Sequence, residues 1–171
     1  NTWGKRITNQ AIRVLSGHHE VGVLLFDKEL DVEQWLFRLT PAANFPRLVT
    51  LVNRARIGDM PTFATTMEMG LAGLAHSDAT IRRMVIISDG DPSAPTDELL
   101  EKFQQEKITV STVTVSPHGD SDRTSMKRIA DATGGTAYMP DTPAELPSIF
   151  VKEARTVKRS MIQEGTIDPQ P

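Results

Sequence analysis

The sequence predicts an α/β fold of three layers, in which a doubly wound, mostly parallel sheet is flanked by helices on both faces. Apolar strings bounded by turn residues alternate along the chain with segments of helical period. Parallel strands need a crossover helix between them, so this alternation indicates a mostly parallel sheet. The 171 residues fit one domain that can bury a substantial core.

The first half of the chain is predicted to hold three helices and two strands. Helical spacing of apolar residues indicates helices at Lys5–Leu15, Phe45–Ala55 and Thr65–Ala75, and the glycines of the third helix would allow close approach to a sheet. Val21–Asp27 is apolar up to its final acid, which is typical of a strand buried on both faces. In Asp31–Leu39 apolar and polar residues alternate more regularly. This segment is predicted to be an edge strand, paired with the previous strand in a hairpin.

The second half is predicted to continue the alternation. Met84–Ser88 and the β-branched stretch Ile108–Val115 are expected to be strands. Thr96 is a candidate N-cap for the helix between them, since two acids follow it. A helix from about Ser121 to Thr133, with Gly134 as a left-handed C-cap, then leads to a short strand at Thr136–Met139.

A last helix is predicted after Thr142, which forms a capping box with Glu145 and has proline at the first helical position. Residues 1–160 are assigned to the domain and residues 161–171 to a tail or linker. The basic residues of this helix fit a solvated face or a juxtamembrane segment. The apolar residues expected to be buried are Leu146, Ile149, Phe150, Ala154 and Val157, and the basic ones are Lys152, Arg155, Lys158 and Arg159.

The first predicted element is a helix with no strand before it. In a doubly wound sheet the first strand is commonly central, with binding sites at its carboxyl end. Its loss would open a gap of one strand spacing, about 4.8 Å, in the middle of the core. We therefore expect the central first strand to be absent from this sequence. Such a gap could be filled in trans, which would give a strand-exchanged homodimer.

Composition excludes several classes of function. The chain has no cysteine, which rules out disulfide frameworks, thiolate metal sites and cysteine nucleophiles. Nineteen basic and 22 acidic residues give a net charge of −3, which removes the simplest electrostatic argument for binding nucleic acid. No apolar run approaches the roughly 20 residues that span a bilayer. No phosphate-binding loop, dinucleotide fingerprint or nucleophile elbow occurs, so an enzyme is not expected.

Two carboxylates, Asp89 and Asp91, directly follow the predicted strand Met84–Ser88. Ligands of an open α/β sheet bind outside the carboxyl ends of the strands. Carboxylate and hydroxyl oxygens without cysteine suit a hard cation such as Mg²⁺. Thr62 and Asp59 stand in another loop before a helix and could share that ion. Together they supply few ligands for an octahedral ion.

The order of elements and several motifs resemble a von Willebrand factor type A (vWA) domain of bacterial type that begins just after its first strand. The matching stretches are VGVLLFD for the second strand, the GDMPT loop, VIISDGDP for the strand-to-loop (T/S)DG motif, and TVSTVTV followed by MKRIADATGGTAYMP. The resemblance covers nearly all of residues 5–160. It implies a protein-interaction module, Rossmann-like in fold, rather than an enzyme.

In that family a metal-ion-dependent adhesion site combines an Asp-x-Ser-x-Ser motif with a threonine and an aspartate from two further loops. The resemblance implies the threonine role for Thr62 and the aspartate role for Asp89. No Asp-x-Ser-x-Ser occurs in this sequence, so the site is incomplete as written. The bound ion would be Mg²⁺, Mn²⁺ or Ca²⁺, and a carboxylate of a protein partner would occupy its open position. Similar bacterial domains in membrane-anchored proteins favour an extracytoplasmic, tethered location.

Local roles for the same residues stay open. Thr62 could cap the following helix, and the acids beside Gly58 and Gly90 could be turn residues. Metal ligation is also less favoured than a loop role for the histidine pair at 18 and 19 and for His118, and His76 is expected to end a helix. Two other functions remain: a metal-independent vWA scaffold with a degenerate site, and a hydrolase or phosphotransferase using Mg²⁺ with Asp89 and Asp91.

Overall fold

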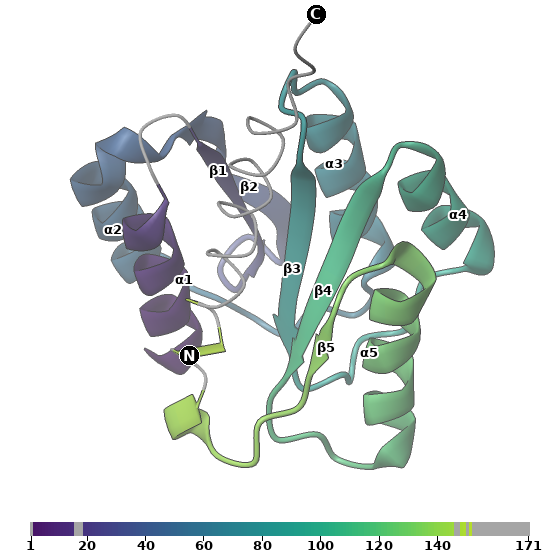
Figure 1. Ribbon diagram of the computed structural model, residues 1–171. Coiled ribbons are helices and arrows are strands. Elements are labelled where there is room, and N and C mark those ends of the chain that lie inside the picture. Colours follow the sequence, from purple (N-terminus) through teal and green to yellow (C-terminus); the bar gives the residue numbers. More distant parts are fainter. Residues whose placement is uncertain (1, 16–18, 146–147, 150, 152–171) are drawn as a thin grey trace, which may run out of the picture.

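A computed structural model describes residues 2–15, 19–145, 148–149 and 151 (Figure 1). The predicted tail, the basic cluster and most apolar positions of the predicted last helix lie outside the described residues. No helix in the described part of the chain is both long and apolar enough to cross a membrane.

Five helices and five strands form the described fold, together with two short 3₁₀ helices. They follow the order predicted from the sequence, with ends that differ by a few residues. The α-helices are α1 (Thr2–Val14), α2 (Phe45–Arg54), α3 (Ala64–Ala75), α4 (Asp97–Gln105) and α5 (Asp120–Thr133), the strands are β1 (Glu20–Asp27), β2 (Val32–Pro41), β3 (Arg82–Ser88), β4 (Ile108–Thr114) and β5 (Ala137–Tyr138), and the 3₁₀ helices are Ala42–Asn44 and Pro143–Glu145.

The predicted caps are present and define where the helices begin and end. Thr96 accepts a hydrogen bond through its side-chain oxygen from the Leu99 N–H at 3.2 Å, at the start of α4. Gly134 follows α5 in the left-handed conformation with φ of 79°, which glycine adopts without steric cost. The Thr142 N–H donates to Glu145 Oε2 at 3.0 Å, which is one half of the predicted capping box.

The strands form two separate sheets. β1 and β2 pair as an antiparallel hairpin, and β3, β4 and β5 pair in parallel in that order. In the residues that the structure describes, no strand pairs with both β1 and β3, so each has a strand partner on one side only. This division confirms the expected interruption in the middle of the sheet.

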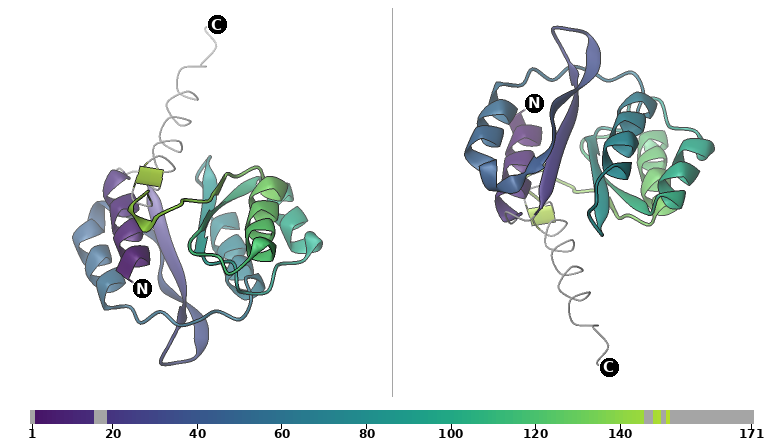
Figure 2. Two further views of the ribbon diagram at one scale, coloured as in Figure 1. Left: turned by 90° about the horizontal axis from the view of Figure 1, so that it is seen from below. Right: turned by 90° about the horizontal axis from the view of Figure 1, so that it is seen from above.

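Helices on both faces hold the two sheets together. On one face α1 places Ile7 against β3 and β4, and Ile12 against α2 and the hairpin. On the other face α3 touches both sheets, since Gly70 meets side chains from β1 and β3, and Gly73 meets Trp35 of β2. Figure 2 shows α1 and α2 together on one side, while α3, α4 and α5 form a row on the other. The glycines therefore allow the close approach that the sequence predicted.

The largest core cluster lies between β4 and the helices α3, α4 and α5. Its fully enclosed members include Phe103, Val110, Met126 and Ile129, each 0% exposed. The prediction that Val21–Asp27 would be buried on both faces is wrong for most of that strand. Only Leu25 and Phe26 of β1 are buried, because β1 has a strand partner on one side only and the hairpin forms the outer part of the fold.

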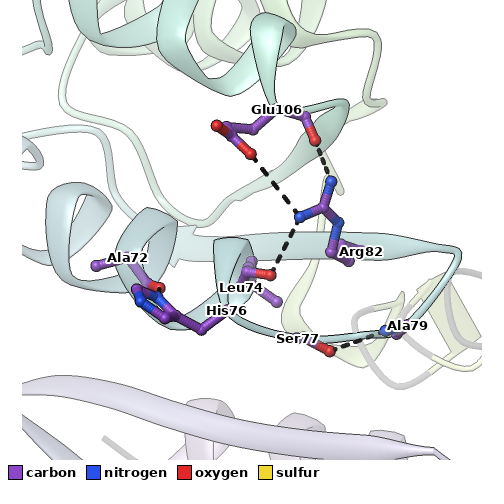
Figure 3. A network of polar contacts seen from close by, with 7 residues as sticks. All are labelled: Ala72, Leu74, His76, Ser77, Ala79, Arg82 and Glu106. Carbon is purple, nitrogen blue, oxygen red and sulfur yellow. Dashed lines mark hydrogen bonds and ion pairs between the residues drawn. The ribbon is translucent and has the colours of Figure 1, made fainter.

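Arg82, at the amino end of β3, forms polar contacts with the ends of two helices (Figure 3). Its guanidinium donates to the Leu74 carbonyl at 3.3 Å and to the Glu106 carbonyl, and lies 4.0 Å from the Glu106 carboxylate. These carbonyls stand at the C-terminal ends of α3 and α4, where the helix dipole favours a cation. His76 caps α3, as predicted, with Nδ1 at 2.7 Å from the Ala72 carbonyl.

Candidate functional site

The candidate site lies where β3 ends and its chain turns toward α4. Asp89 directly follows β3, and its side chain is 41% exposed. Asp89 Oδ1 accepts a hydrogen bond from the Asp91 N–H at 3.0 Å and lies 3.5 Å from the Ser88 hydroxyl. This carboxylate therefore closes an Asx turn, and Asp91 is a member of that turn, as the local interpretation of the sequence predicted.

The second oxygen of Asp89 faces the next loop of the sheet. Asp89 Oδ2 lies 3.5 Å from His118 Nε2, and the His118 N–H donates to Asp122 Oδ2 at 3.0 Å. Gly90 packs on α5 with φ of 90°, and a methyl group built on it would lie 2.7 Å from Asp122 Cβ. A glycine is therefore required between the two acids of this loop. Asp89, in the loop after β3, therefore lies beside His118, which is hydrogen-bonded to Asp122 of α5.

Thr62 lies in the neighbouring loop, just before α3. Its hydroxyl accepts from the Ala64 N–H at 3.2 Å and lies 3.4 Å from the Ser93 carbonyl. The first contact is a local turn just before the helix. Thr62 is not the N-cap of α3 as the alternative interpretation expected, because Phe63 holds that position and makes no side-chain cap hydrogen bond.

Backbone hydrogen bonds join the Thr62 loop to the loop of Asp89. The Phe63 N–H donates to the Ser93 carbonyl and the Ser93 N–H to the Pro61 carbonyl, both at 3.0 Å. These bonds form a parallel bridge between Thr62 and Ser93. The structure thus brings together the two loops that the sequence assigned to one site.

Other acids near the strand ends have structural roles or lie apart. Asp27, at the end of β1, accepts from the backbone N–H groups of Glu29 and Leu30 and from Gln34 Nε2, at 2.7 to 2.9 Å. These bonds fix the hairpin turn and occupy the carboxylate. Asp59 is exposed in the segment before α3.

The donor chemistry of the two loops suits a hard divalent cation, since it consists of a hydroxyl and carboxylate oxygens. Among the described residues, no group of three or more histidine, cysteine, aspartate or glutamate side chains is arranged to hold a metal ion. Thr62 and Asp89 would therefore need water oxygens and an oxygen from another chain to complete an octahedral shell. Of the histidine pair at 18 and 19, the first lies outside the described residues.

Sequence reasoning did not place His118 beside Asp89. The two residues are far apart along the chain, and their contact depends on how β3 and β4 align. That β3 and β4 lie in parallel was predictable, and the order of strands brings their following loops to one edge of the sheet. The acids and hydroxyls around His118 in SPHGDSD were the only local signal.

Comparisons with known proteins identify the fold. No protein-family model and no curated protein matches this sequence. A von Willebrand factor type A protein from Catenulispora acidiphila is 17% identical with a TM-score of 0.72, over 90% of this chain and 37% of that one. The BatB protein from Bacteroides thetaiotaomicron is 13% identical with a TM-score of 0.67, over 91% and 87% of the two chains. The VWA domain of SpRpn10 is 13% identical with a TM-score of 0.66, over 89% and 82%.

Proposed function

We propose that this chain, which has the fold of vWA domains, is a protein-interaction module that binds its partner through a divalent cation at the loops of Thr62 and Asp89. The observation that carries the proposal is the pair of backbone hydrogen bonds between Ser93 and the residues on either side of Thr62. They hold a hydroxyl loop and a carboxylate loop together where an open α/β sheet binds ligands.

The proposed ion is Mg²⁺, with Mn²⁺ or Ca²⁺ as substitutes. Thr62 would contribute a neutral hydroxyl and Asp89 a carboxylate, directly or through water. An ion with so little protein charge around it remains electrophilic and favours a further anion. A carboxylate of the protein partner would supply it. The proposal concerns binding and assigns no catalytic residue.

The test is a calorimetric titration of Mg²⁺, and then Mn²⁺, into the chain. We expect saturable binding that is lost in Thr62→Ala and in Asp89→Ala. Asp59→Ala is the matched control, because Asp59 is an exposed acid of the same segment as Thr62, and it should bind as the unchanged protein does. Absence of heat in the unchanged protein, or equal binding by all three variants, would contradict a metal site at these loops.

A metal-independent vWA scaffold is the second candidate, and one observation favours it. The Thr62 hydroxyl and Asp89 Oδ1 both already accept hydrogen bonds from nearby backbone N–H groups. On this alternative the loops keep their shape with a degenerate site, and the partner binds elsewhere. Thr62→Ala would then lower the free energy of unfolding by about 1 kcal/mol, through loss of the hydrogen bond from the Ala64 N–H, without changing the response to Mg²⁺.

A further inference from the structure

His118 and Asp89 face each other at the carboxyl end of the parallel sheet without a hydrogen bond between them. His118 Nε2 lies 3.5 Å from Asp89 Oδ2, which is longer than the roughly 2.7 to 3.2 Å of a hydrogen bond from a ring nitrogen. Among the described residues, neither of these two atoms has a hydrogen-bond partner. The side chains of His118 and Asp89 are 73% and 41% exposed, so an ion from solution can reach the space between them.

The backbones that carry the two side chains are held in place. Asp89 Oδ1 accepts from the Asp91 N–H at 3.0 Å, and Oδ2 is the oxygen that faces His118. The His118 N–H donates to Asp122 Oδ2 at 3.0 Å, which ties the histidine to the first turn of α5. Gly90 packs against Asp122 of the same helix. Both loops are therefore fixed against α5, and an ion between the side chains would meet prearranged ligands.

The distance between the two atoms is that of neighbouring ligands in a tetrahedral zinc site. Zinc bonds of about 2.0 to 2.2 Å to imidazole nitrogen and carboxylate oxygen place two tetrahedral ligands about 3.3 to 3.5 Å apart. Neighbouring ligands of an octahedral Mg²⁺ would lie only about 3.0 Å apart, and Mg²⁺ prefers oxygen to imidazole. The observed separation of 3.5 Å therefore suits Zn²⁺ better than Mg²⁺.

The charge of the two loops also favours a cation. Residues 88–93 and 116–123 contain four aspartates and one arginine. The arginine, Arg123, is paired with Asp120, since Nη1 lies 3.4 Å from Oδ1. Among the described residues, no lysine or arginine pairs with the other three aspartates, Asp89, Asp91 and Asp122. A divalent cation would offset part of this negative charge.

We propose that the chain binds Zn²⁺ between Asp89 Oδ2 and His118 Nε2. No third histidine, cysteine, aspartate or glutamate completes a metal-binding group among the described residues, so the other two positions of a tetrahedral shell take water or a ligand from a bound partner. The imidazole distinguishes this site from the oxygen ligands of Thr62 and Asp89, because nitrogen ligation favours Zn²⁺ over Mg²⁺ and Ca²⁺. The inference gives His118 a role beyond the proposed function and does not depend on Thr62.

The test is a titration of Zn²⁺ into the whole isotope-labelled chain, followed by long-range proton–nitrogen NMR correlations of the imidazole rings. The chain has four histidines, and the spectrum of His118→Gln identifies the signals of His118. We expect His118 Nε2 to shift in a saturable manner with Zn²⁺ and to keep its position at the same concentrations of Mg²⁺. The calorimetric titration with Mg²⁺ reports separately on Thr62 and Asp89, so either proposal can fail without the other.

Asp89→Asn removes the charged ligand and keeps an oxygen for the turn with Asp91. We expect Zn²⁺ to bind this variant about tenfold more weakly or less, because losing a ligand costs at least as much as losing a hydrogen bond that supports one. Asp120→Asn is the matched control and should bind as the unchanged chain does, since Asp120 is an acid near His118 whose side chain is 98% exposed and paired with Arg123.

His118→Ala, at an exposed position, should weaken Zn²⁺ binding in calorimetry by at least as much, which covers the case that Asp89→Asn does not fold. Absence of a saturable shift at His118 Nε2, or an equal shift with Mg²⁺, would overturn the proposal. Equal affinities of Asp89→Asn and Asp120→Asn for Zn²⁺, or unchanged affinity in His118→Ala, would also overturn it.

Discussion

Two neighbouring strands, β3 and β4, show that apolar content and burial can run in opposite directions. β3 has four consecutive apolar residues, yet each of its residues is only half-buried. β4 carries Ser111, Thr112 and Thr114, and these three hydroxyl residues are at most 1% exposed. The strand with fewer apolar residues is therefore the more deeply buried one.

Position in the sheet explains the difference. β4 has strand neighbours on both sides, and its buried hydroxyls find partners: Thr112 Oγ1 donates to the Met126 carbonyl at 3.1 Å, and Ser111 Oγ accepts from the Thr136 N–H at 3.1 Å. β3 has β4 on one side only. Its apolar run is typical of a strand that is buried on both faces.

The largest expected effect comes from truncating one isoleucine in each strand. Ile108→Ala in β4 should lower the free energy of unfolding by about 4 kcal/mol, whereas Ile86→Ala in β3 should cost about 2 kcal/mol. Ile108 is 1% exposed, so its loss leaves an enclosed cavity, while the space around half-buried Ile86 can be reached by water. Urea denaturation measures both values. Equal costs would mean that β3 is as enclosed as β4.

Much of the fold was predictable because its signals are local. Thr96 caps α4 and Gly134 ends α5, as the sequence predicted, since each effect involves residues within one helical turn. The wrong prediction for β1 concerned burial, which depends on contacts between distant parts of the chain. Its apolar run predicted burial on both faces, but burial depends on which strand lies beside it, and β1 is bonded to β2 alone among the described strands.

Filling two glycines that face these strands should give the next largest difference. A methyl group on Gly135 would lie 2.0 Å from the Val110 carbonyl oxygen of β4, and backbone cannot move aside. We expect Gly135→Ala to cost about 3 kcal/mol. Gly70→Ala meets the flexible end of Met84 on β3, so it should cost about 1 kcal/mol.

Thermal unfolding of the two glycine variants, followed by circular dichroism, is the measurement. A Gly70→Ala variant as unstable as Gly135→Ala would show that Met84 is held as rigidly as the backbone of β4. The Met84 side chain would then be unable to move aside, and the contrast between β3 and β4 would not hold.

The candidate site was predictable only in part. As with the burial of β1, some of its contacts join segments that are distant along the chain. Thr62 and Asp89 were assigned from loop motifs, and the structure joins their loops through Ser93. The contact between Asp89 and His118 links separate segments, and no spacing along the chain encodes it.

The smallest expected difference separates two threonines on the same face of β4. Thr112→Val removes a hydrogen bond to Met126 and should cost about 1 kcal/mol. Thr114 Oγ1 is buried and has no hydrogen-bond partner among the described residues, so Thr114→Val should be neutral or stabilising. Chemical denaturation of both variants checks the order. A loss at Thr114→Val equal to that at Thr112→Val would reveal a partner for this hydroxyl in the folded protein.

Arg82 also bears on the order in which the chain folds. Its bonds to the Leu74 and Glu106 carbonyls close loops of 8 and 24 residues, which are short on the scale of the domain. Short loops cost little chain entropy to close, so contacts of this kind form early. The region from α3 to β4 can thus acquire its native arrangement as one local unit.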